Sequence, residues 1–359
     1  MHIVYLIERI DIKGGIERSL TVRVNYLIKK YNYNITLICT EKKTGIPAYK
    51  LNPLVNIIFL ENLTSKQTVY GRVLLRLKQT KVILNLNPEI IISTKYTLHN
   101  VFFRTLRTKA KLISELRETK ENYNLNRNNS LKSRLNTYIR DYIFRKQNLL
   151  IVLTNADKKN WGFDNIKVIP NPKTIESNIV SPLTNKQVLA VGRLETVKGF
   201  DKLIDVWYIV TKKHPNWKLK ICGEGSEYSN LIKKVELLNI EDHITITNKS
   251  IPIIPEFLNS SIFVLTSQFE SFGNVMVEAK VCGVPIVAFD APNGPREIII
   301  DNKDGFLIEL NNIDSMANKI NYLIENPNII KKMGIIGKVN SNKYDVETIV
   351  EYYNKIIIG

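Results

Sequence analysis

The sequence predicts an α/β protein built from two doubly wound parallel sheets, and three observations lead to this fold class. Short apolar runs alternate with helical segments along the whole chain, which is typical of parallel sheets covered by helices on both faces. The alternation stops near residue 170 and resumes near residue 188. At 359 residues the chain exceeds the usual size of one domain, so we expect two domains of similar size.

The first half contains six apolar runs that predict strands. They cover residues 3–7, 35–39, 57–60, 90–93, 112–114 and 149–153. Helices are predicted at 19–31 and 131–145. The segment 168–173 contains two prolines, and 174–186 is polar without periodicity, so we expect a linker there.

Residues 69–78 have the pattern of a basic amphipathic helix, with Val69, Val73, Leu74 and Leu77 on one face. Such a helix can lie on a membrane surface. An ordinary surface helix shows the same pattern when it packs its apolar side on a sheet, and we favour this second interpretation.

The second half repeats the alternation of strands and helices. Strands are predicted at 188–191, 219–222, 244–247, 262–266, 285–288 and 305–308. Helices are predicted at 201–213, 228–238 and 313–325. The two halves therefore look like two similar units, each with a parallel sheet.

The net positive charge of the chain indicates which kinds of molecule it can bind. The chain has 51 Lys and Arg residues against 34 Asp and Glu, a net charge of +17. Residues 101–150 alone hold twelve basic and four acidic side chains. A basic surface attracts polyanions, but basic and aromatic residues do not interleave and no nucleic-acid-binding signature occurs. We expect no nucleic acid partner, and favour an anionic membrane surface or a phosphate-bearing acceptor.

Cysteine usage and hydropathy indicate a cytoplasmic protein. Cys39, Cys222 and Cys282 are widely spaced, without a CxxC sequence or a histidine cluster, which predicts a reducing compartment and no structural metal. Glu8 and Arg9 interrupt the apolar start of the chain too early for a signal sequence. No run reaches the roughly 20 apolar residues of a membrane span, so any membrane contact is expected to be peripheral, at the inner face.

The strongest chemical signal is a pair of glutamates, Glu270 and Glu278. They follow the predicted strand 262–266 and flank a Ser-Phe-Gly-Asn-Val sequence at 271–275. The carboxyl ends of parallel strands are where open α/β sheets bind ligands. The backbone amides of 272–275 would start the next helix, and such amides can hold a phosphate.

A second motif follows the strand 188–191. A short loop carries Arg193 and Lys198, and Gly199 permits the turn into the next helix. Two cations fixed at the end of a strand can grip a diphosphate. Two solvated charges on a surface loop fit the pair equally well.

Two glycine-containing turns also follow strands. Gly14 and Gly15 lie between the first strand and a helix, where backbone amides can approach a ligand. Such turns also use glycine for geometry alone. Gly223 and Gly225 lack the third glycine of a dinucleotide fingerprint, which indicates a turn or the wall of a pocket.

Taken together, these motifs resemble family 4 of the retaining glycosyltransferases, nucleotide-sugar enzymes with the two-domain GT-B architecture. The resemblance spans nearly the whole chain and is strongest over residues 188–308. Its specific parts are the pair Glu270 and Glu278, the G-R-L-x-x-x-K-G-F run from Gly192 to Phe200, the Gly14-Gly15 loop, and the sequence GPREII from Gly294 to Ile299.

The resemblance implies two Rossmann-like domains that face each other across a cleft. Residues 1–172 would bind the acceptor, and residues 173–340 would bind the nucleotide-sugar. A final helix often crosses back in this family. Residues 344–357 fit that helix, so 341–359 are expected to pack on the first domain.

Carried over position by position, the resemblance implies that Glu278 hydrogen-bonds the ribose and that Arg193 and Lys198 hold the donor diphosphate. Glu270 would contact the transferred sugar. The catalytic set is thus Glu270, Arg193 and Lys198. The other donor-binding positions are Gly15, Ser271, Phe272, Gly273, Asn274 and Val275. Negative charge grows on the leaving diphosphate, so fixed cations and helix-start amides lower the barrier.

The acceptor side departs from the family pattern. Many relatives place a histidine near the cleft, but residues 113–119 contain none. His99 lies in the neighbouring loop, and a lone histidine is more often structural. Arg117 or Glu115 would then replace the missing contact.

Metals and cofactors are not expected besides the nucleotide-sugar substrate. The sequence contains no D-x-D, the divalent-ion clamp of the other common glycosyltransferase architecture. The expected reaction is retaining transfer of a hexose-type sugar, with a uridine donor as the family's commonest choice. The acceptor is a saccharide, and the basic first half favours one linked to a lipid diphosphate, as in bacterial capsule, exopolysaccharide or O-antigen assembly.

Three other functions compete with sugar transfer. A nucleotide-sugar 2-epimerase shares the GT-B frame and is the main alternative; it would isomerise the donor without an acceptor. A nicotinamide-dependent dehydrogenase needs a glycine fingerprint that neither half offers convincingly. A non-catalytic binding module would make little use of the whole set of donor-site residues.

Overall fold

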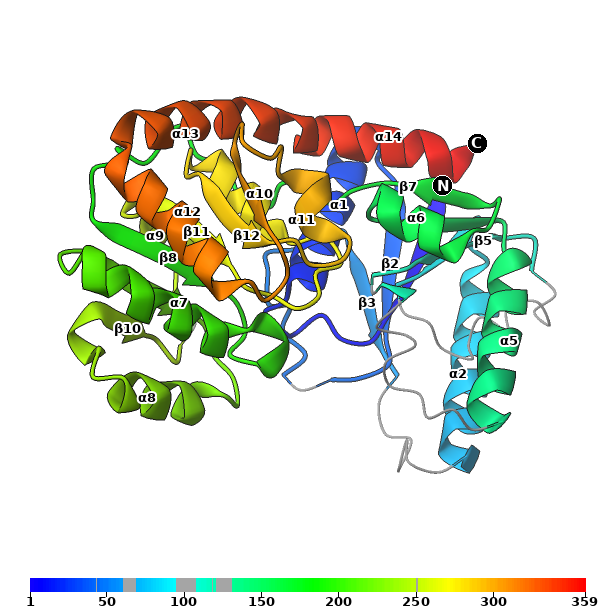
Figure 1. The fold of residues 1–359 in the computed structure, drawn as a ribbon. Helices are drawn as coiled ribbons and strands as arrows, with labels where there is room; N and C mark the ends of the chain where they lie inside the picture. The colour runs from blue at the N-terminus through cyan, green and yellow to red at the C-terminus, as the bar shows by residue number, and fades with distance from the viewer. Residues whose placement is uncertain (43, 61–68, 95–107, 118, 121–130, 250) are drawn as a thin grey trace. The chain divides into compact units, whose positions relative to one another are not determined.

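The computed structural model describes residues 1–359 except 43, 61–68, 95–107, 118, 121–130 and 250. The side chains of 69–74, 76 and 131–133 also lie outside the description. The chain divides into two compact units, which can be followed in Figure 1 by residue number. Unit 1 contains residues 1–172 and 346–359, and unit 2 contains residues 173–345.

The described residues of unit 1 form a fully parallel seven-stranded sheet in the order β3-β2-β1-β4-β5-β6-β7. The strands are β1 (His2–Ile7), β2 (Asn34–Cys39), β3 (Asn56–Phe59), β4 (Ile90–Ser93), β5 (Lys111–Glu115), β6 (Leu149–Val152) and β7 (Ile166–Val168). Six of them begin and end within one residue of the predicted runs, and β7 was not predicted.

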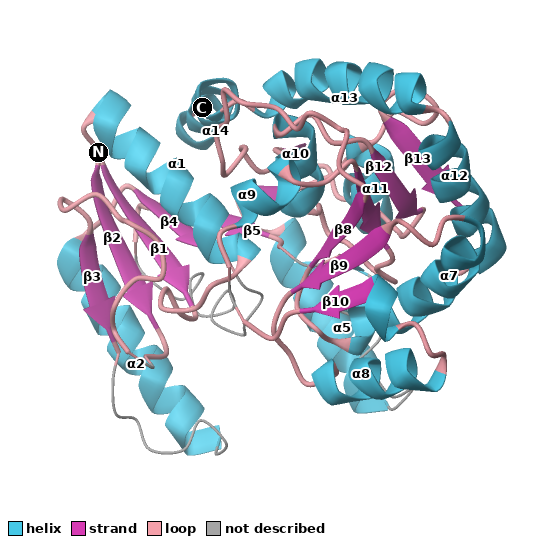
Figure 2. Cartoon of the chain, turned by 90° about the vertical axis from the view of Figure 1, so that its left-hand side faces the viewer, coloured by secondary structure: helices cyan, strands magenta, loops and turns pink. Residues whose placement is uncertain are grey.

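Helices cover both faces of this sheet (Figure 2). They include α1 (Gly15–Tyr31), α2 (Val69–Leu86), α5 (Leu131–Arg145), α6 (Asn155–Trp161) and α14 (Val346–Ile358). Side chains alternate along a strand, so Ile3 and Tyr5 pack with α1 and α14 on one face. Val4 and Leu6 pack on the other face, with residues of α2.

The apolar face predicted for α2 is wrong at Leu77. Leu77 is 55% exposed, whereas Leu75 is 6% and Ile83 is 1% exposed. The buried positions recur at the helical spacing of Leu75, Gln79 and Ile83. Val73, Leu74, Leu75 and Leu77 are almost consecutive in the sequence and point in different directions around a helix, so periodicity alone did not select the buried face.

The predicted linker is wrong for residues 168 and 173–186. Val168 belongs to β7, which pairs with β6. Ile175 and Ser181 are buried in unit 2, and the backbone N–H of Ser181 donates to the carbonyl of Cys282 at 2.9 Å. The segment therefore packs on unit 2, and its polar composition does not indicate a free connection.

The described residues of unit 2 form a parallel six-stranded sheet in the order β10-β9-β8-β11-β12-β13. The strands are β8 (Gln187–Val191), β9 (Lys218–Cys222), β10 (Ile244–Ile246), β11 (Ile262–Leu265), β12 (Ile286–Phe289) and β13 (Gly305–Ile308). All six were predicted to within one residue at each end.

Seven helices occur in the described part of unit 2: α7 (Phe200–Lys213), α8 (Tyr228–Leu237), α9 (Ile253–Leu258), α10 (Asn274–Val281), α11 (Gly294–Ile298), α12 (Ile313–Glu325) and α13 (Pro327–Ser341). The sequence did not predict α9, α11 and α13. The first two have six and five residues, too few for a helical period, and α13 contains Gly334 and Gly337.

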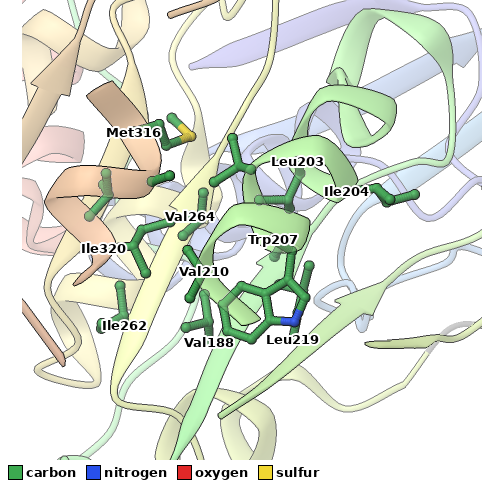
Figure 3. Packing of buried hydrophobic residues seen from close by; sticks show 14 of the residues in the cluster. Val188, Leu203, Ile204, Trp207, Val210, Leu219, Ile262, Val264, Met316 and Ile320 are labelled. Atoms are coloured by element: carbon green, nitrogen blue, oxygen red, sulfur yellow. The ribbon is translucent and has the colours of Figure 1, made fainter. Parts of the chain in front are cut away.

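The core of unit 2 is centred on Trp207 of α7 (Figure 3), which is fully buried. Its indole Nε1 donates to the carbonyl oxygen of His243 at 2.9 Å, so the polar atom of the ring is satisfied. Val188, Val264 and Ile320 belong to the same cluster. This packing fixes α7 on β8 and β11, the strands that carry the candidate site.

Each sheet has one switch point, the place where the strand order reverses. In unit 1 it lies between β1 and β4, and in unit 2 between β8 and β11. Open α/β sheets bind ligands beside such a point, at the carboxyl ends of the strands.

Candidate active site

Two predicted site residues meet at the switch point of unit 2. Lys198 ends a short 3-10 helix, Thr196–Lys198, after β8, and Glu270 follows β11. The Nζ of Lys198 donates a hydrogen bond to Oε1 of Glu270. Ser267 Oγ donates to the same oxygen at 3.1 Å. The side chains of Lys198 and Glu270 are 18% and 11% exposed, so the pair is accessible at the edge of the sheet.

Two hydrogen bonds join the loops that carry this pair. Thr266 Oγ1 donates to the carbonyl oxygen of Lys198 at 3.0 Å. The backbone N–H of Gln268 donates to the carbonyl oxygen of Val197 at 2.8 Å. Gly199 has a φ of +63°, and a Cβ there would overlap the carbonyl oxygen of Thr266. Glycine is therefore required at 199 both for its conformation and for space.

The segment between the two glutamates ends in the start of α10. Gly273 has a φ of +88° and precedes the helix, which begins at Asn274. Phe272 is 2% exposed and packs edge-on against Tyr344, with ring centroids 5.5 Å apart. The first N–H groups of a helix have no partner within the helix, and its positive dipole end favours an anion.

Glu278 lies in the second turn of α10 and is 5% exposed. Thr174 Oγ1 donates to Glu278 Oε1 at 2.7 Å. Thr174 was not predicted, because it lies in the segment interpreted as a linker. The contact orients the carboxylate that the family resemblance assigns to the ribose.

The GPREII sequence at 294–299 packs against the segment between Glu270 and Glu278. The N–H of Gly294 donates to the carbonyl of Glu270 at 2.9 Å. A Cβ on Gly294 would overlap the carbonyl oxygen of Phe272. The glycine therefore lets the start of α11 lie directly against the segment between the two glutamates.

Arg193 is separate from the Lys198–Glu270 pair. Its side chain is 68% exposed, and Nη1 donates to Oε1 of Glu195 at 2.6 Å. An exposed ion pair of this kind contributes little stability. Rotation of Arg193 toward a ligand would therefore cost little.

Gly223 and Gly225 lie against the loop that carries Arg193. The N–H of Leu194 donates to the carbonyl of Glu224 at 2.8 Å. Cβ atoms on Gly223 and Gly225 would overlap the carbonyl oxygens of Gly192 and Leu194. Close approach of the backbone to residues 192 and 194 therefore requires glycine at both positions.

A buried ion pair anchors α10. Lys280 Nζ donates to Asp304 Oδ2 at 2.6 Å, and neither side chain is exposed. The same Nζ donates to the carbonyl of Ile298, and Asn340 donates to Asp304 Oδ2 at 2.7 Å. Burial lowers the pKa of Lys280, while Asp304 acts in the opposite direction. This network was not predicted, since its members are distant in sequence.

The candidate acceptor residues of unit 1 are buried in an ion-pair network. Glu115 is 1% and Arg117 is 6% exposed. Glu115 accepts hydrogen bonds from Arg23 Nη1 at 2.5 Å, from Arg117 Nη2 and from the hydroxyl of Tyr353 in α14. The carboxylate is thus fully engaged inside unit 1. His99 lies outside the described residues.

The pKa of Glu115 reflects this environment. Burial opposes its ionisation, but Arg117, Arg23 and the hydroxyl of Tyr353 outweigh burial and lower the pKa from 4.5 to about 2. Glu115 therefore remains charged at neutral pH and serves as the internal counterion of two guanidinium groups.

The described residues contain neither a cluster of metal-ligating side chains nor a helix that could span a membrane. No group of three or more His, Cys, Asp or Glu side chains there could hold a metal ion. In the same part of the chain, no helix combines the length and hydropathy needed to cross a bilayer.

Comparisons with known proteins agree with this fold and show the family. Residues 173–339 match the family model described as glycosyl transferases group 1. An uncharacterized glycosyltransferase of Haemophilus influenzae is 30% identical over 359 residues, covering 98% of this chain and 99% of that protein. An N-acetylgalactosamine-N,N'-diacetylbacillosaminyl-diphospho-undecaprenol 4-alpha-N-acetylgalactosaminyltransferase of Campylobacter jejuni is 23% identical and covers 96% of each chain.

The fold has close counterparts among solved structures. HepE of Anabaena, crystallised with UDP and glucose, superposes with a TM-score of 0.79 at 20% identity, covering 100% of this chain and 99% of that one. Two parallel α/β units of this kind form the GT-B architecture, and the family model and the relatives show that the protein is a glycosyltransferase. The chain belongs to the glycosyl transferases group 1 family.

Proposed function

We propose that this glycosyltransferase retains configuration and moves a hexose-type sugar from a UDP-sugar to a saccharide acceptor linked to a lipid diphosphate, in the assembly of a bacterial surface polysaccharide. The main support for a nucleotide-sugar donor is the Lys198–Glu270 pair at the switch point of unit 2. Glu270 lies directly before the start of α10. Positive charge and sugar-binding carboxylates are thereby gathered at one sheet edge.

Each donor-side residue has a role in the proposed reaction. Lys198, Arg193 and the start of α10 stabilise the charge that develops on the leaving diphosphate. Glu278 accepts hydrogen bonds from the ribose hydroxyls, and Glu270 contacts the transferred sugar. The structure of HepE with UDP and glucose supports the choice of a uridine donor.

Retention follows from attack on the face that the diphosphate leaves. The bond between C1 of the sugar and the phosphate oxygen breaks, and C1 bonds to the acceptor oxygen on the same side. The acceptor proton passes to the leaving phosphate oxygen. The alpha linkage named for the Campylobacter relative supports this outcome.

The acceptor proposal rests on charge and on that relative. Residues 101–150 hold twelve basic and four acidic side chains, which favours a diphosphate-bearing acceptor and peripheral contact with anionic lipid. The Campylobacter relative is named for an acceptor on diphospho-undecaprenol. We propose the same class of acceptor here.

The donor is tested by thermal-shift screening against UDP-, GDP- and ADP-sugars, followed by a transfer assay with the donor that stabilises the protein most. We expect UDP-sugars to stabilise it and sugar transfer to follow. Because Lys198 and Arg193 neutralise the phosphates, transfer should survive EDTA. Abolition by EDTA with rescue by Mg²⁺ would contradict this, and isomerised donor formed without acceptor would indicate the epimerase instead.

A further inference from the structure

One carboxylate at the switch point of unit 1 has no role in the reaction described so far. Glu17 lies in the first turn of α1, directly after the Gly14-Gly15 loop that leaves β1. It is half-buried, and no side chain in the described part of the chain forms a hydrogen bond or an ion pair with it. Its acceptor capacity is therefore largely unused at the edge where ligands bind.

The side chain of Glu17 lies over the Gly14-Gly15 loop. A Cβ on Gly14 would overlap Oε2 of Glu17, so the glycine leaves room for the carboxylate to fold back. Gly14 has an extended backbone with a φ of −133°, which any residue adopts. The carboxylate end of Glu17 therefore lies directly beside Gly14, in space that a side chain at position 14 would share with it.

Two guanidinium groups beside Glu17 have unused donors. Arg9 donates through Nε to Asp11 at 2.8 Å, and Arg117 donates through Nη1 to Asn171 at 2.6 Å. Yet Arg9 Nη2 and Arg117 Nε are buried without a partner in the described structure. Arg117 is 94% buried. Buried polar atoms nearly always have a hydrogen-bond partner, so the unpaired Nε of Arg117 requires an explanation.

These charged groups act on one another. Burial raises the pKa of Glu17, and its own backbone N–H, Arg117 and Arg9 oppose the rise, while Glu8 adds to it. A carboxylate and two arginines with spare hydrogen-bonding capacity therefore lie close together at one sheet edge, and Glu115 and Asn171 hold Arg117 in place.

The charge pattern selects the class of ligand. An anion would be repelled by Glu17 and Glu8, and a metal cation by Arg9 and Arg117. A neutral polyhydroxyl ligand fits, because each sugar hydroxyl both donates and accepts. Carboxylate oxygens accept from such hydroxyls, and guanidinium N–H groups donate to their oxygens.

We propose that Glu17, with Arg9 and Arg117 beside it, forms the saccharide-binding site for the acceptor, with Glu17 accepting hydrogen bonds from its hydroxyls. This inference rests on the proposed transferase function. It replaces Glu115 as the carboxylate that meets the acceptor, since Glu115 is enclosed by its own partners.

The test compares Glu17→Gln with the matched control Glu347→Gln, an exposed carboxylate on α14. The acceptor probes are the octyl β-glycosides of glucose, galactose, N-acetylglucosamine and N-acetylgalactosamine. We expect Glu17→Gln to raise the KM for the best glycoside by about tenfold or more, since hydrogen bonds to a charged group are lost. The KM for the donor and the rate of donor hydrolysis without acceptor should match those of the wild type.

Two results would overturn the inference. One is an acceptor KM for Glu17→Gln that equals the wild-type value. The other is a parallel loss of donor hydrolysis, which would indicate a purely structural role. If the wild type neither hydrolyses nor transfers any donor, the proposed function fails instead. Saturation-transfer NMR with the same glycosides then decides the binding role of Glu17 separately.

Discussion

Lys198 and Glu270 are 72 residues apart in the sequence, and a hydrogen bond joins them at the carboxyl ends of β8 and β11. The reversal of strand order makes this contact, because it places two sequence-distant strand ends side by side. A cation, a carboxylate and the start of α10 are thereby brought to one edge of unit 2.

Removal of the Lys198 ammonium should act mainly on turnover. Lys198→Ala is expected to lower kcat by about 10²- to 10³-fold, as for other preorganised groups that stabilise developing charge. Lys233→Ala, on the exposed surface of α8, is the matched control and should leave kcat unchanged. Initial-rate kinetics at saturating donor measure both. A Lys198→Ala enzyme with wild-type kcat would exclude the proposed role.

Glu278 should determine donor affinity. Glu278→Gln is expected to weaken UDP binding by about tenfold or more, because a charged acceptor of hydrogen bonds is lost. Thr174→Val, which removes only the orienting hydroxyl, should have a smaller effect in the same direction. Isothermal titration calorimetry with UDP compares the two variants. Equal affinity in all three proteins would place the ribose elsewhere.

The Lys280–Asp304 pair should be necessary for the stability of unit 2. Lys280→Met leaves Asp304 charged and buried without its counterion, a change that costs about 3–5 kcal/mol. Lys332→Met on the exposed surface of α13 should stay within about 0.5 kcal/mol of the wild type. Chemical denaturation provides the measurement. Similar midpoints for both variants would show that the pair is dispensable.

Acid stability should depend on Tyr353. The pKa of Glu115 is lowered to about 2, so the stability from its ionised form is complete above the unfolded value of about 4.5 and is lost as the pH falls toward 2. Tyr353→Phe removes one donor to Glu115 and raises its pKa. The acid-induced fall in Tm should then begin at higher pH than in the wild type.

The neighbouring Tyr352 provides the control for that experiment, because it lies on the same helix and is 44% exposed. Tyr352→Phe should follow the wild-type curve of Tm against pH. If the Tyr353→Phe and wild-type curves coincide down to pH 2, the hydrogen bond from Tyr353 does not hold the pKa of Glu115 down.

The sequence predicted most of the fold and the loops that carry the candidate donor residues. Apolar runs located twelve of the thirteen strands, because buried parallel strands are short and continuously apolar. The spacing from Glu270 to Glu278 correctly placed a loop and a helix start after β11. These features are local, so periodicity and turn chemistry were sufficient to find them.

Long-range contacts could not be predicted. Glu115 looked available for an acceptor, but Tyr353, 238 residues further on, closes over it. Leu75 rather than Leu77 packs inward in α2, because several adjacent apolar residues give no unique face. Thr174 reaches Glu278 from a segment without any periodic pattern. In each case the deciding partner comes from a distant part of the chain.

The central claim is that the switch point of unit 2 binds the nucleotide-sugar. A crystal structure of the protein with bound UDP tests it most directly. We predict that the diphosphate lies within hydrogen-bond distance of Lys198 Nζ and of the first amides of α10, with the ribose on Glu278. Density for UDP at a position away from both Lys198 and Glu278 would contradict the account.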